Sequence, residues 1–393
     1  MDQPRGERQV MIKTRLNRRS IAMLATLALL AGCKVIPKGA PVATQPVDQP
    51  SDRLPTDAQR HRVALLVPMS GPNAGVGESI ANATTMALLD TNAQNLRITT
   101  YDTAAGPAAA AARAVADGNK LILGPVQSDE VAAIATIARA AKVPLIAYVA
   151  DGAVAARDVF ILGTVPGNSV TRTVSYAWGK GVRRYAVLAP NGEYGQRASA
   201  AFAEAVRASG GTLVASESYE RSNTSIISAA RRIRAKGGVE AVLIADGSRF
   251  AAQAAAQLKP AGAAVPRLLG TDLWSGESVI ATNPALRGAW FSAVSDTRFR
   301  QFAESYKGRF GAAPYRISTL GYDSVLLTIR IARDWKPGTS FPTSRLSDRG
   351  GFLGLDGPFR FDANGVVERA LEIRESRGGT MTVVSPAPAR FAD

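Results

Sequence analysis

The sequence has one cysteine and one histidine in 393 residues. A single cysteine excludes a disulfide within the chain. With His61 as the one histidine, the sequence argues against a catalytic triad that depends on histidine. The chain also has no cysteine and histidine cluster of the kind that binds zinc. No glycine-rich segment has the lysine and the spacing of a phosphate-binding loop. We therefore predict no metal, no cofactor and no catalytic residue, and a protein that acts by binding.

Long apolar runs are also lacking, apart from one of ten residues, Ile21–Leu30. It is too short for a membrane span, which needs about 20 residues. Basic residues precede it, namely Lys13, Arg15, Arg18 and Arg19. This order is typical of an export signal, and the run ends in Ala31-Gly32-Cys33, a lipobox. We predict that residues 1–32 are a lipoprotein signal peptide and that Cys33 is lipidated, with Met1 or Met11 as the start. The alternative is an ordinary signal peptide with a chance cysteine.

Residues 33–60 are rich in proline and polar side chains, with five prolines and almost no apolar periodicity. This composition predicts an extended, mobile tether. Lys34 follows the predicted lipidation site, where lipoproteins kept in the inner membrane commonly have aspartate. Lys34 therefore indicates the outer membrane, with the rest of the chain facing the periplasm.

The chain is strongly basic. Its formal net charge of +15 falls to +11 without residues 1–32, which hold six basic and two acidic residues. An exported basic protein favours anionic partners such as lipid headgroups or cell-wall polymer, and we predict no nucleic-acid partner in that compartment. The densest basic run, Arg231–Lys236, is interpreted as the solvated face of a helix, with a specific anion site as the alternative.

From His61 onward, short apolar runs of the kind found in buried parallel strands alternate with helical segments. The predicted strands are 62–67, 96–101, 121–123 and 143–147, then 185–189, 212–219, 241–245 and 267–269. The predicted helices are 78–90, 104–117, 130–141, 195–209, 224–236, 248–258, 297–309 and 318–334. Two such series predict two α/β units with parallel sheets. The chain ends in a β-rich segment with a hairpin over 359–365, where Asn-Gly makes the turn.

Ligands of open α/β sheets bind beyond the carboxyl ends of the strands. The loops at those ends are 68–77, 124–130, 148–152, 191–195 and 270–274. Ser128 and backbone N–H groups at a helix N-terminus suit a carboxylate, unless Ser128 or Asp129 only caps that helix. Tyr194 and Trp274 either face a ligand or pack beside the hinge. The candidate cleft residues are Ser70, Gln127, Ser128, Ala150, Asp151, Tyr194, Asp272 and Trp274.

An ordered series of motifs over residues 61–380 resembles the leucine/isoleucine/valine-type periplasmic binding proteins. The motifs are Pro68–Ala74, Tyr101–Thr103, Gly124-Pro125, Val143–Ile146 and Glu193–Gly195. The resemblance implies an α/β fold, the type I periplasmic-binding-protein fold, with two Rossmann-like lobes, three crossover strands and a cleft between the lobes. We place the crossovers near 163–168, 291–296 and 334–351. The first lobe is then 61–165 plus 294–335, and the second is 166–293 plus 345–386.

The resemblance also implies roles for some cleft residues. Ser128 matches a receptor hydroxyl that holds the carboxylate and amine of an amino acid, and Tyr194 matches an aromatic residue that closes over the ligand. Asp272 stands where the receptors have a glutamate that meets the ligand amine. After the fourth strand the receptors have Ala-Thr, whereas here Ala150 is followed by Asp151. The pocket is thus partly kept and partly changed.

Three later segments, 268–274, 288–291 and 354–369, resemble the penicillin-binding protein activators of α-proteobacteria, which are lipoproteins of the same fold. The resemblance implies a non-catalytic outer-membrane lipoprotein that activates a peptidoglycan synthase, a penicillin-binding protein. The alternative is a periplasmic solute receptor that delivers a branched-chain amino acid or related small molecule to an ABC transporter. A third hypothesis is a structural lipoprotein that binds the cell wall.

Overall fold

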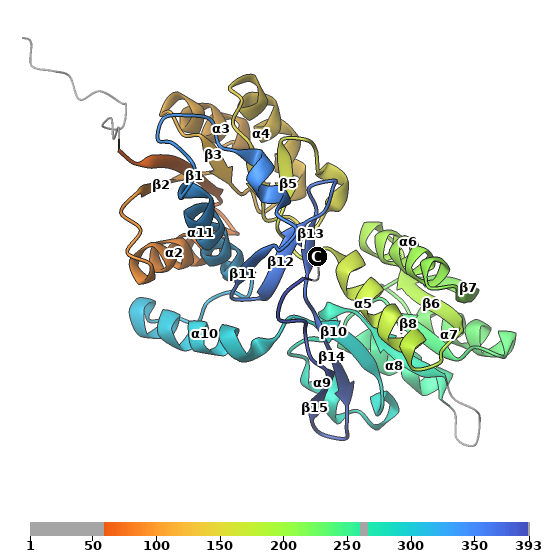
Figure 1. The fold of residues 1–393 in the computed structure, drawn as a ribbon. Helices are drawn as coiled ribbons and strands as arrows, with labels where there is room; N and C mark the ends of the chain where they lie inside the picture. Colours follow the sequence, from red (N-terminus) through yellow and green to blue (C-terminus); the bar gives the residue numbers. More distant parts are fainter. Residues whose placement is uncertain (1–58, 260–265, 392–393) are drawn as a thin grey trace, which may run out of the picture. The chain divides into compact units, whose positions relative to one another are not determined.

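The computed structural model describes residues 59–259 and 266–391. The predicted signal peptide, Cys33 and almost all of the predicted tether lie outside the described residues. The described residues all belong to one compact unit (Figure 1). Within the described ranges, no helix has both the length and the apolar character needed to cross a membrane.

The unit alternates strands with helices along most of its length. The strands of the first part are β1 (His61–Val67), β2 (Leu96–Asp102), β3 (Leu121–Leu123), β4 (Leu145–Ala147) and β5 (Val159–Ile161). The next strands are β6 (Arg184–Pro190), β7 (Thr212–Tyr219), β8 (Ala241–Ile244), β9 (Arg267–Gly270) and β10 (Trp290–Ala293). The last strands are β11 (Phe352–Gly354), β12 (Gly357–Phe361), β13 (Val367–Arg369), β14 (Glu372–Ser376) and β15 (Met381–Ser385).

The helices occupy the segments between these strands. The first are α2 (Ala74–Asp90), α3 (Pro107–Ala116), α4 (Ser128–Ala140), α5 (Pro166–Gly179) and α6 (Glu193–Ala208). The later ones are α7 (Ser225–Lys236), α8 (Ser248–Leu258), α9 (Ser278–Thr282), α10 (Asp296–Phe310) and α11 (Ser318–Ala332). Short 3₁₀ helices are η1 (Gly152–Val154), η2 (Asp272–Trp274), η3 (Pro284–Leu286) and η4 (Thr343–Ser347).

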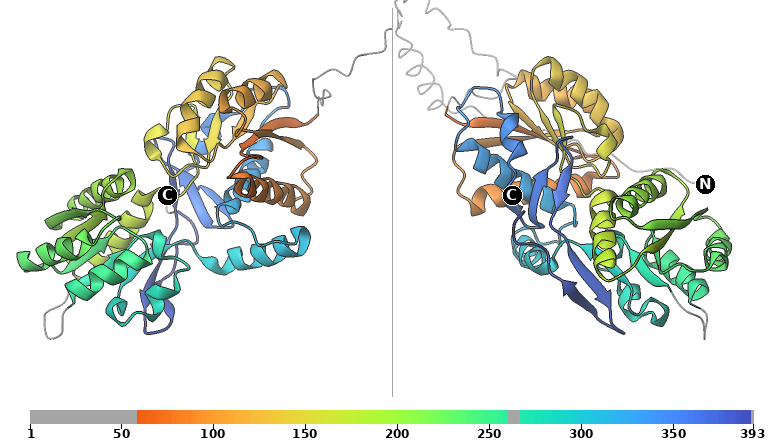
Figure 2. Two further views of the ribbon diagram at one scale, coloured as in Figure 1. Left: turned by 180° about the vertical axis from the view of Figure 1, so that it is seen from behind. Right: turned by 45° about the vertical axis from the view of Figure 1, so that its right-hand side comes forward.

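The first sheet has the order β2-β1-β3-β4-β5 and all its strand pairs are parallel. Side chains of a strand point alternately to its two faces, and β1 shows this directly. Val63, Leu65 and Val67 join the core with α2 and α11, whereas Ala64 and Leu66 join the core with α3 and α4. Both faces are therefore covered by helices, as the predicted apolar runs require (Figures 1 and 2).

The second sheet has the order β15-β14-β10-β9-β8-β6-β7. Strands β6 to β10 run parallel, and β14 and β15 add an antiparallel edge. Its strands also divide their side chains between two cores: Ala186 and Leu188 of β6 lie in one, and Tyr185 and Val187 lie in the other. The predicted α/β architecture with two sheet-based lobes is confirmed.

The helix after β1 begins at Ala74, four residues before its predicted start at Glu78. Gly77 explains the difference, because a Cβ there would lie 1.8 Å from the carbonyl oxygen of Pro68. The glycine therefore lets the first turn of α2 pack directly on the end of β1. The predicted loop 68–77 is correspondingly shorter in the structure.

The predicted hairpin over 359–365 is confirmed, since β12 and β13 pair antiparallel with Phe361 opposite Val367. Its assignment to the second lobe needs correction. β11 to β13 form a separate three-stranded sheet whose phenylalanines join the core of the first sheet. The backbone N–H of Ile161 also donates to the carbonyl of Gly365 at 2.8 Å. The chain returns to the second sheet only at β14, because alternate residues of β12 supply apolar surface to the first lobe.

Substitution of Phe359 tests whether β12 packs on the first lobe, since the side chain of Phe359 is 1% exposed in the core of the first sheet. We expect Phe359→Ala to lower the free energy of unfolding by about 3–5 kcal/mol, through lost burial and the cavity left behind. Urea unfolding measures the effect. Leu353→Ala on neighbouring β11 is the control, because Leu353 is 53% exposed and should cost under about 1 kcal/mol. Equal, small effects of both substitutions would contradict the packing.

Candidate functional site

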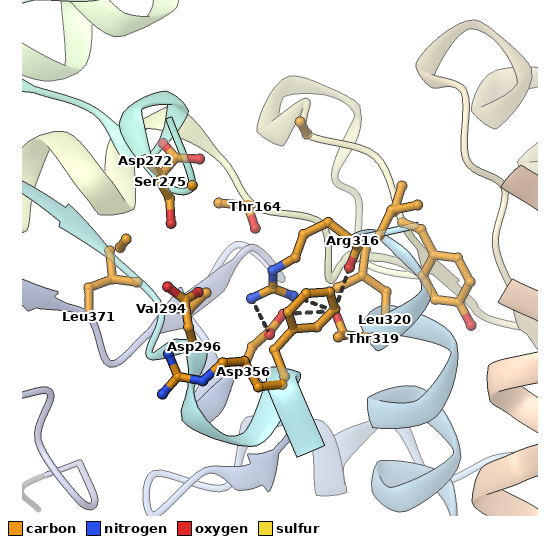
Figure 3. Close-up of a pocket in the computed structure, with 17 residues that line it drawn as sticks. Thr164, Asp272, Ser275, Val294, Asp296, Arg316, Thr319, Leu320, Asp356 and Leu371 are labelled. Carbon is orange, nitrogen blue, oxygen red and sulfur yellow. Dashed lines mark hydrogen bonds and ion pairs between the residues drawn. The ribbon is translucent and has the colours of Figure 1, made fainter. Parts of the chain in front are cut away.

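A cavity of about 590 Å³ lies where the first sheet, the second sheet and α11 meet. Its lining comes from loops at strand ends and from the starts of α10 and α11. The residues that line it are Tyr148, Ala150, Thr164, Asp272, Ser275, Gly276, Ala293, Val294, Asp296, Phe299, Arg300, Arg316, Ile317, Thr319, Leu320, Asp356 and Leu371. The wall thus combines apolar side chains with three carboxylates and two guanidinium groups (Figure 3).

Arg316 and Asp356 form the main polar group of the wall. Their side chains make an ion pair at 2.7 Å, and the hydroxyl of Thr319 donates to the other Asp356 oxygen at 2.9 Å. Arg316 also donates to the Thr319 hydroxyl at 3.1 Å and lies 4.3 Å above the ring of Phe299. Figure 3 shows this group with the bonds dashed. The charge of Asp356 is therefore balanced by Arg316, but its Oδ1 atom and the Arg316 Nη2 atom that faces it make no hydrogen bond.

The turn that carries Asp356 is fastened by a buried carboxylate beneath it. Asp323 on α11 is 0% exposed and accepts from the backbone N–H of Leu355 at 2.6 Å. Gly354 is required here, because a Cβ would lie 2.3 Å from that carboxyl group. Burial, reinforced by nearby Asp356, raises the pKa of Asp323 to about 7, against the opposing effect of Arg369 at 3.8 Å.

Asp272 lies on the wall just after β9. Its backbone N–H donates to the hydroxyl of Ser169 at 2.8 Å, and no ion pair involves it within the described ranges. Burial raises the pKa of its carboxyl group to about 6. Asp296, by contrast, is neutralised by Arg374 at 2.7 Å. Asp272 is therefore a desolvated carboxylate that is stabilised by a proton or by a cationic group.

The structure brings two of the predicted cleft residues, Ala150 and Asp272, to this cavity. Tyr194 bonds the hydroxyl of Thr271 at 3.1 Å. Trp274 is buried and its indole N–H donates to the carbonyl of Asp246 at 2.8 Å. Neither Tyr194 nor Trp274 lines the cavity.

The other predicted residues lie outside the lining of this cavity. Ser70 donates to Asp102 at 2.7 Å. Gln127 occupies the N-cap of α4 without a side-chain capping bond, and Ser128 is the first helical residue. Asp151 is buried, accepts from the backbone N–H of Ala153 at 2.8 Å, and pairs with Arg197 at 2.6 Å.

Sequence reasoning missed Arg300, Arg316, Thr319 and Asp356. Only Asp356 carried a signal, as part of the Gly-Leu-Asp-Gly segment whose two glycines mark a tight turn. Among the residues placed by the structure, no three acidic, histidine or cysteine side chains are grouped as a metal site.

Comparisons with known proteins bear on the fold and the family. The model of the family described as periplasmic binding protein matches residues 61–380. A Rhodospirillum rubrum structure described as a branched-chain amino acid ABC transporter superposes with a TM-score of 0.73 at 21% identity, over 83% of this chain and 100% of that one. Full-length LpoA of Haemophilus influenzae superposes with a TM-score of 0.66 at 19% identity, over 84% of this chain and 60% of LpoA.

A curated relative, an uncharacterized protein of Rickettsia prowazekii, is 29% identical over 173 residues. That match covers 44% of this chain and 46% of the relative, so this chain spans about half the length of the curated relative that it matches.

The raised pKa of Asp272 predicts a pH-dependent stability. A carboxyl group whose pKa is higher in the folded than in the unfolded state stabilises fully below pH 4, and this contribution is lost as pH rises through about 6. We expect Asp272→Asn to raise the free energy of unfolding at pH 7.5 by at most about 3 kcal/mol, with little change at pH 4. Urea unfolding at the two pH values measures this. Glu304→Gln, at an exposed carboxylate on α10, is the control. A gain for Asp272→Asn that is equal at both pH values would contradict the assignment.

Proposed function

Because this chain belongs to the periplasmic binding protein family, we propose that it acts by binding and that it regulates a peptidoglycan synthase from the periplasm. Proteins of this family are generally non-catalytic. Two of the three carboxylates of the cavity are paired with arginines, Asp356 with Arg316 and Asp296 with Arg374. This arrangement favours recognition over acid–base chemistry, so we propose that the chain is not an enzyme.

The ion pair between Asp151 and Arg197 is the observation that carries the proposal. Asp151 follows β4 in the first lobe, and Arg197 lies on α6 in the second. In the amino-acid receptors that this sequence resembles, a hydroxyl residue after this strand holds the carboxylate of the ligand. Here a buried carboxylate takes its place, and a side chain of the chain itself already satisfies it at 2.6 Å. The lobes are thus joined by their own residues where a receptor uses its ligand.

The pair also has an unfavourable electrostatic consequence for an amino-acid ligand. A second carboxylate placed about 4 Å from Asp151 would be repelled by about 4 kcal/mol at an effective dielectric constant of 20. Arg197 offsets part of this repulsion but is shared with Glu193 on the same helix. Binding of an ordinary amino acid in the receptor manner is therefore disfavoured.

The segment 354–369 supports regulation of a synthase in particular. It resembles penicillin-binding protein activators, and in the structure it forms the turn that carries Asp356 and the strands that pack on the first lobe. The fold shared with LpoA is compatible with this proposal. We further propose that the chain is exported, lipidated at Cys33 and anchored in the outer membrane, with a penicillin-binding protein as its partner.

A reconstituted synthase tests the proposal. We expect the full chain in detergent to raise the rate of glycan polymerisation or of peptide crosslinking several-fold. Arg197→Ala should lose most of this stimulation, because it leaves Asp151 buried without its partner. Arg207→Ala on the same helix is the matched control, since Arg207 pairs with Glu204 at an exposed position. Unchanged rates with the unmodified chain would overturn the proposal.

A second candidate function is a solute receptor for an ABC transporter, with a branched-chain amino acid or a related small molecule as ligand. The cavity of about 590 Å³ favours it, because Asp272 offers a carboxylate for an amine and Arg316 offers donors for an acid group. A ligand held by Asp272 and Arg316 would lie nearer to α11 than a ligand held by the cleft residues that the sequence predicts.

Thermal unfolding of the full chain with branched-chain amino acids tests the receptor function. A true ligand at 100 times its dissociation constant stabilises by about 2.7 kcal/mol. This should raise the midpoint by roughly 5–10 °C for lobes of this size, and Asp272→Ala should abolish the rise. Glu304→Ala should preserve it. No rise with any amino acid would exclude this function for those ligands.

A further inference from the structure

A second cavity, of about 610 Å³, lies at the amino-terminal ends of the strands of the first sheet, opposite the ends that face the first cavity. Strand β4 separates the two cavities: Tyr148 after the strand lines the first, and Val143 and Pro144 before it line the second. The remaining lining comes from the end of α4, the segment before β5, and the segment that leads into η4 with the first residue of η4. Those residues are Arg139, Lys142, Ala156, Arg157, Asp158, Phe341 and Thr343. We call this cavity the basic groove.

The groove has an excess of positive charge. Arg139 donates two hydrogen bonds to Asp158, both at 2.8 Å, and this pairing holds the pKa of Asp158 below its usual value. The groove's one carboxylate is therefore neutralised. Lys142 and Arg157 are exposed, and neither has an ion-pair or side-chain hydrogen-bond partner within residues 59–259 and 266–391. Two cations thus remain for an external anion.

Helix stabilisation accounts for only part of this arrangement. Cations at a helix C-terminus are favoured by the helix dipole, which explains Arg139 and Lys142 at the end of α4. It does not explain Arg157, which lies in the segment between η1 and β5. Arg157 also lines a neighbouring cavity of about 580 Å³, together with Ala156 and Thr343. The two cavities therefore adjoin at Arg157.

The groove is apolar beneath its cations. Val143 and Phe341 are each 4% exposed, and Pro144 lies between Val143 and β4. The hydroxyl of Thr343 adds a donor at the rim. A phosphate group with an attached apolar part matches this combination, because the phosphate meets Lys142 and Arg157 while the apolar part covers the floor.

The groove also lies at the edge where the chain enters the fold. β1 and β4 are parallel and are separated only by β3, so their axes lie about 10 Å apart, with Leu145 of β4 level with Ala64 of β1. The predicted lipidation site, Cys33, is 28 residues before His61 along the predicted tether. An anchor this close to the fold in the sequence would give the groove a high effective concentration of headgroups.

We propose that the basic groove binds the phosphate headgroup of an anionic phospholipid in the membrane that carries the lipid anchor. The inference rests on the anchoring part of the proposed function. Headgroup binding holds the first lobe at the membrane surface. The first cavity, at the carboxyl ends of the strands, then faces away from the lipid. Headgroup affinity alone is weak, and the anchor makes it effective.

Co-sedimentation with vesicles tests the groove without the acyl anchor. The full chain carrying Cys33→Ser is mixed with vesicles of phosphatidylglycerol and phosphatidylcholine, or of phosphatidylcholine alone. We expect binding to the anionic vesicles, and a loss of about 30-fold in the partition coefficient for Lys142→Gln/Arg157→Gln, since each cation near an anionic surface contributes about tenfold or less. Lys236→Gln/Lys307→Gln is the matched control, because both residues are exposed lysines elsewhere on the fold.

The outcomes separate the alternatives. Equal losses in the two double variants would show attraction by overall charge and overturn the groove. Full competition by millimolar inorganic phosphate would assign the site to free phosphate and overturn the membrane proposal. In the synthase assay in detergent, Lys142→Gln/Arg157→Gln should stimulate like the unmodified chain. Vesicle binding and synthase stimulation can therefore fail independently.

Discussion

The buried carboxylate of Asp323 is the contact on which the cavity depends. It accepts from the backbone of the 354–357 turn, and its neighbour Arg369 donates to the carbonyl of Leu162 at 2.9 Å. These bonds fasten the C-terminal three-stranded sheet to α11 and to the end of β5. Removing one partner from such a buried ionic group typically costs about 3–5 kcal/mol. Without them Asp356 would lose its position, and Arg316 would lose the partner that holds it over Phe299.

All strands of the first sheet run in one direction, so the two ends of the strands carry different chemical groups. The carboxyl ends of parallel strands lead into loops that line the first cavity, where acidic and basic groups pair with one another. The amino ends of the same strands meet the C-termini of the helices, where cations are favoured. The basic groove gathers there, at the edge where β1 begins. One sheet can thus serve ligand or partner recognition at one edge and membrane contact at the other.

The apolar periodicity was sufficient to predict most strands and helices, because buried parallel strands are continuous apolar runs such as Leu121–Leu123 and Ala241–Ile244. It did not predict β5 or β10, nor α5, although Pro166 at the first turn of α5 is a start signal. Alternation of apolar residues could not reveal that β12 packs on the first lobe. Periodicity shows which face of a strand is buried, but it does not show which lobe covers that face. Arg316 and Arg157 were missed for a similar reason, since a scattered arginine has no pattern until the fold places it.

The Asp151–Arg197 pair connects this architecture to function. In the receptors that this sequence resembles, residues of the cleft hold the ligand, whereas here Asp151 of the first lobe pairs with Arg197 of the second. A chain whose lobes are joined in this way is suited to presenting a fixed surface to a protein partner, and the activator-like segment lies on the lobe that the basic groove would hold near the membrane.

Equilibrium binding between the full chain and a purified peptidoglycan synthase in detergent shows whether this protein recognises a synthase. We expect saturable binding with a dissociation constant in the micromolar range or tighter, about −8 kcal/mol, that saturating branched-chain amino acids leave unchanged. No binding to the synthase, together with tight binding of an amino acid, would contradict it.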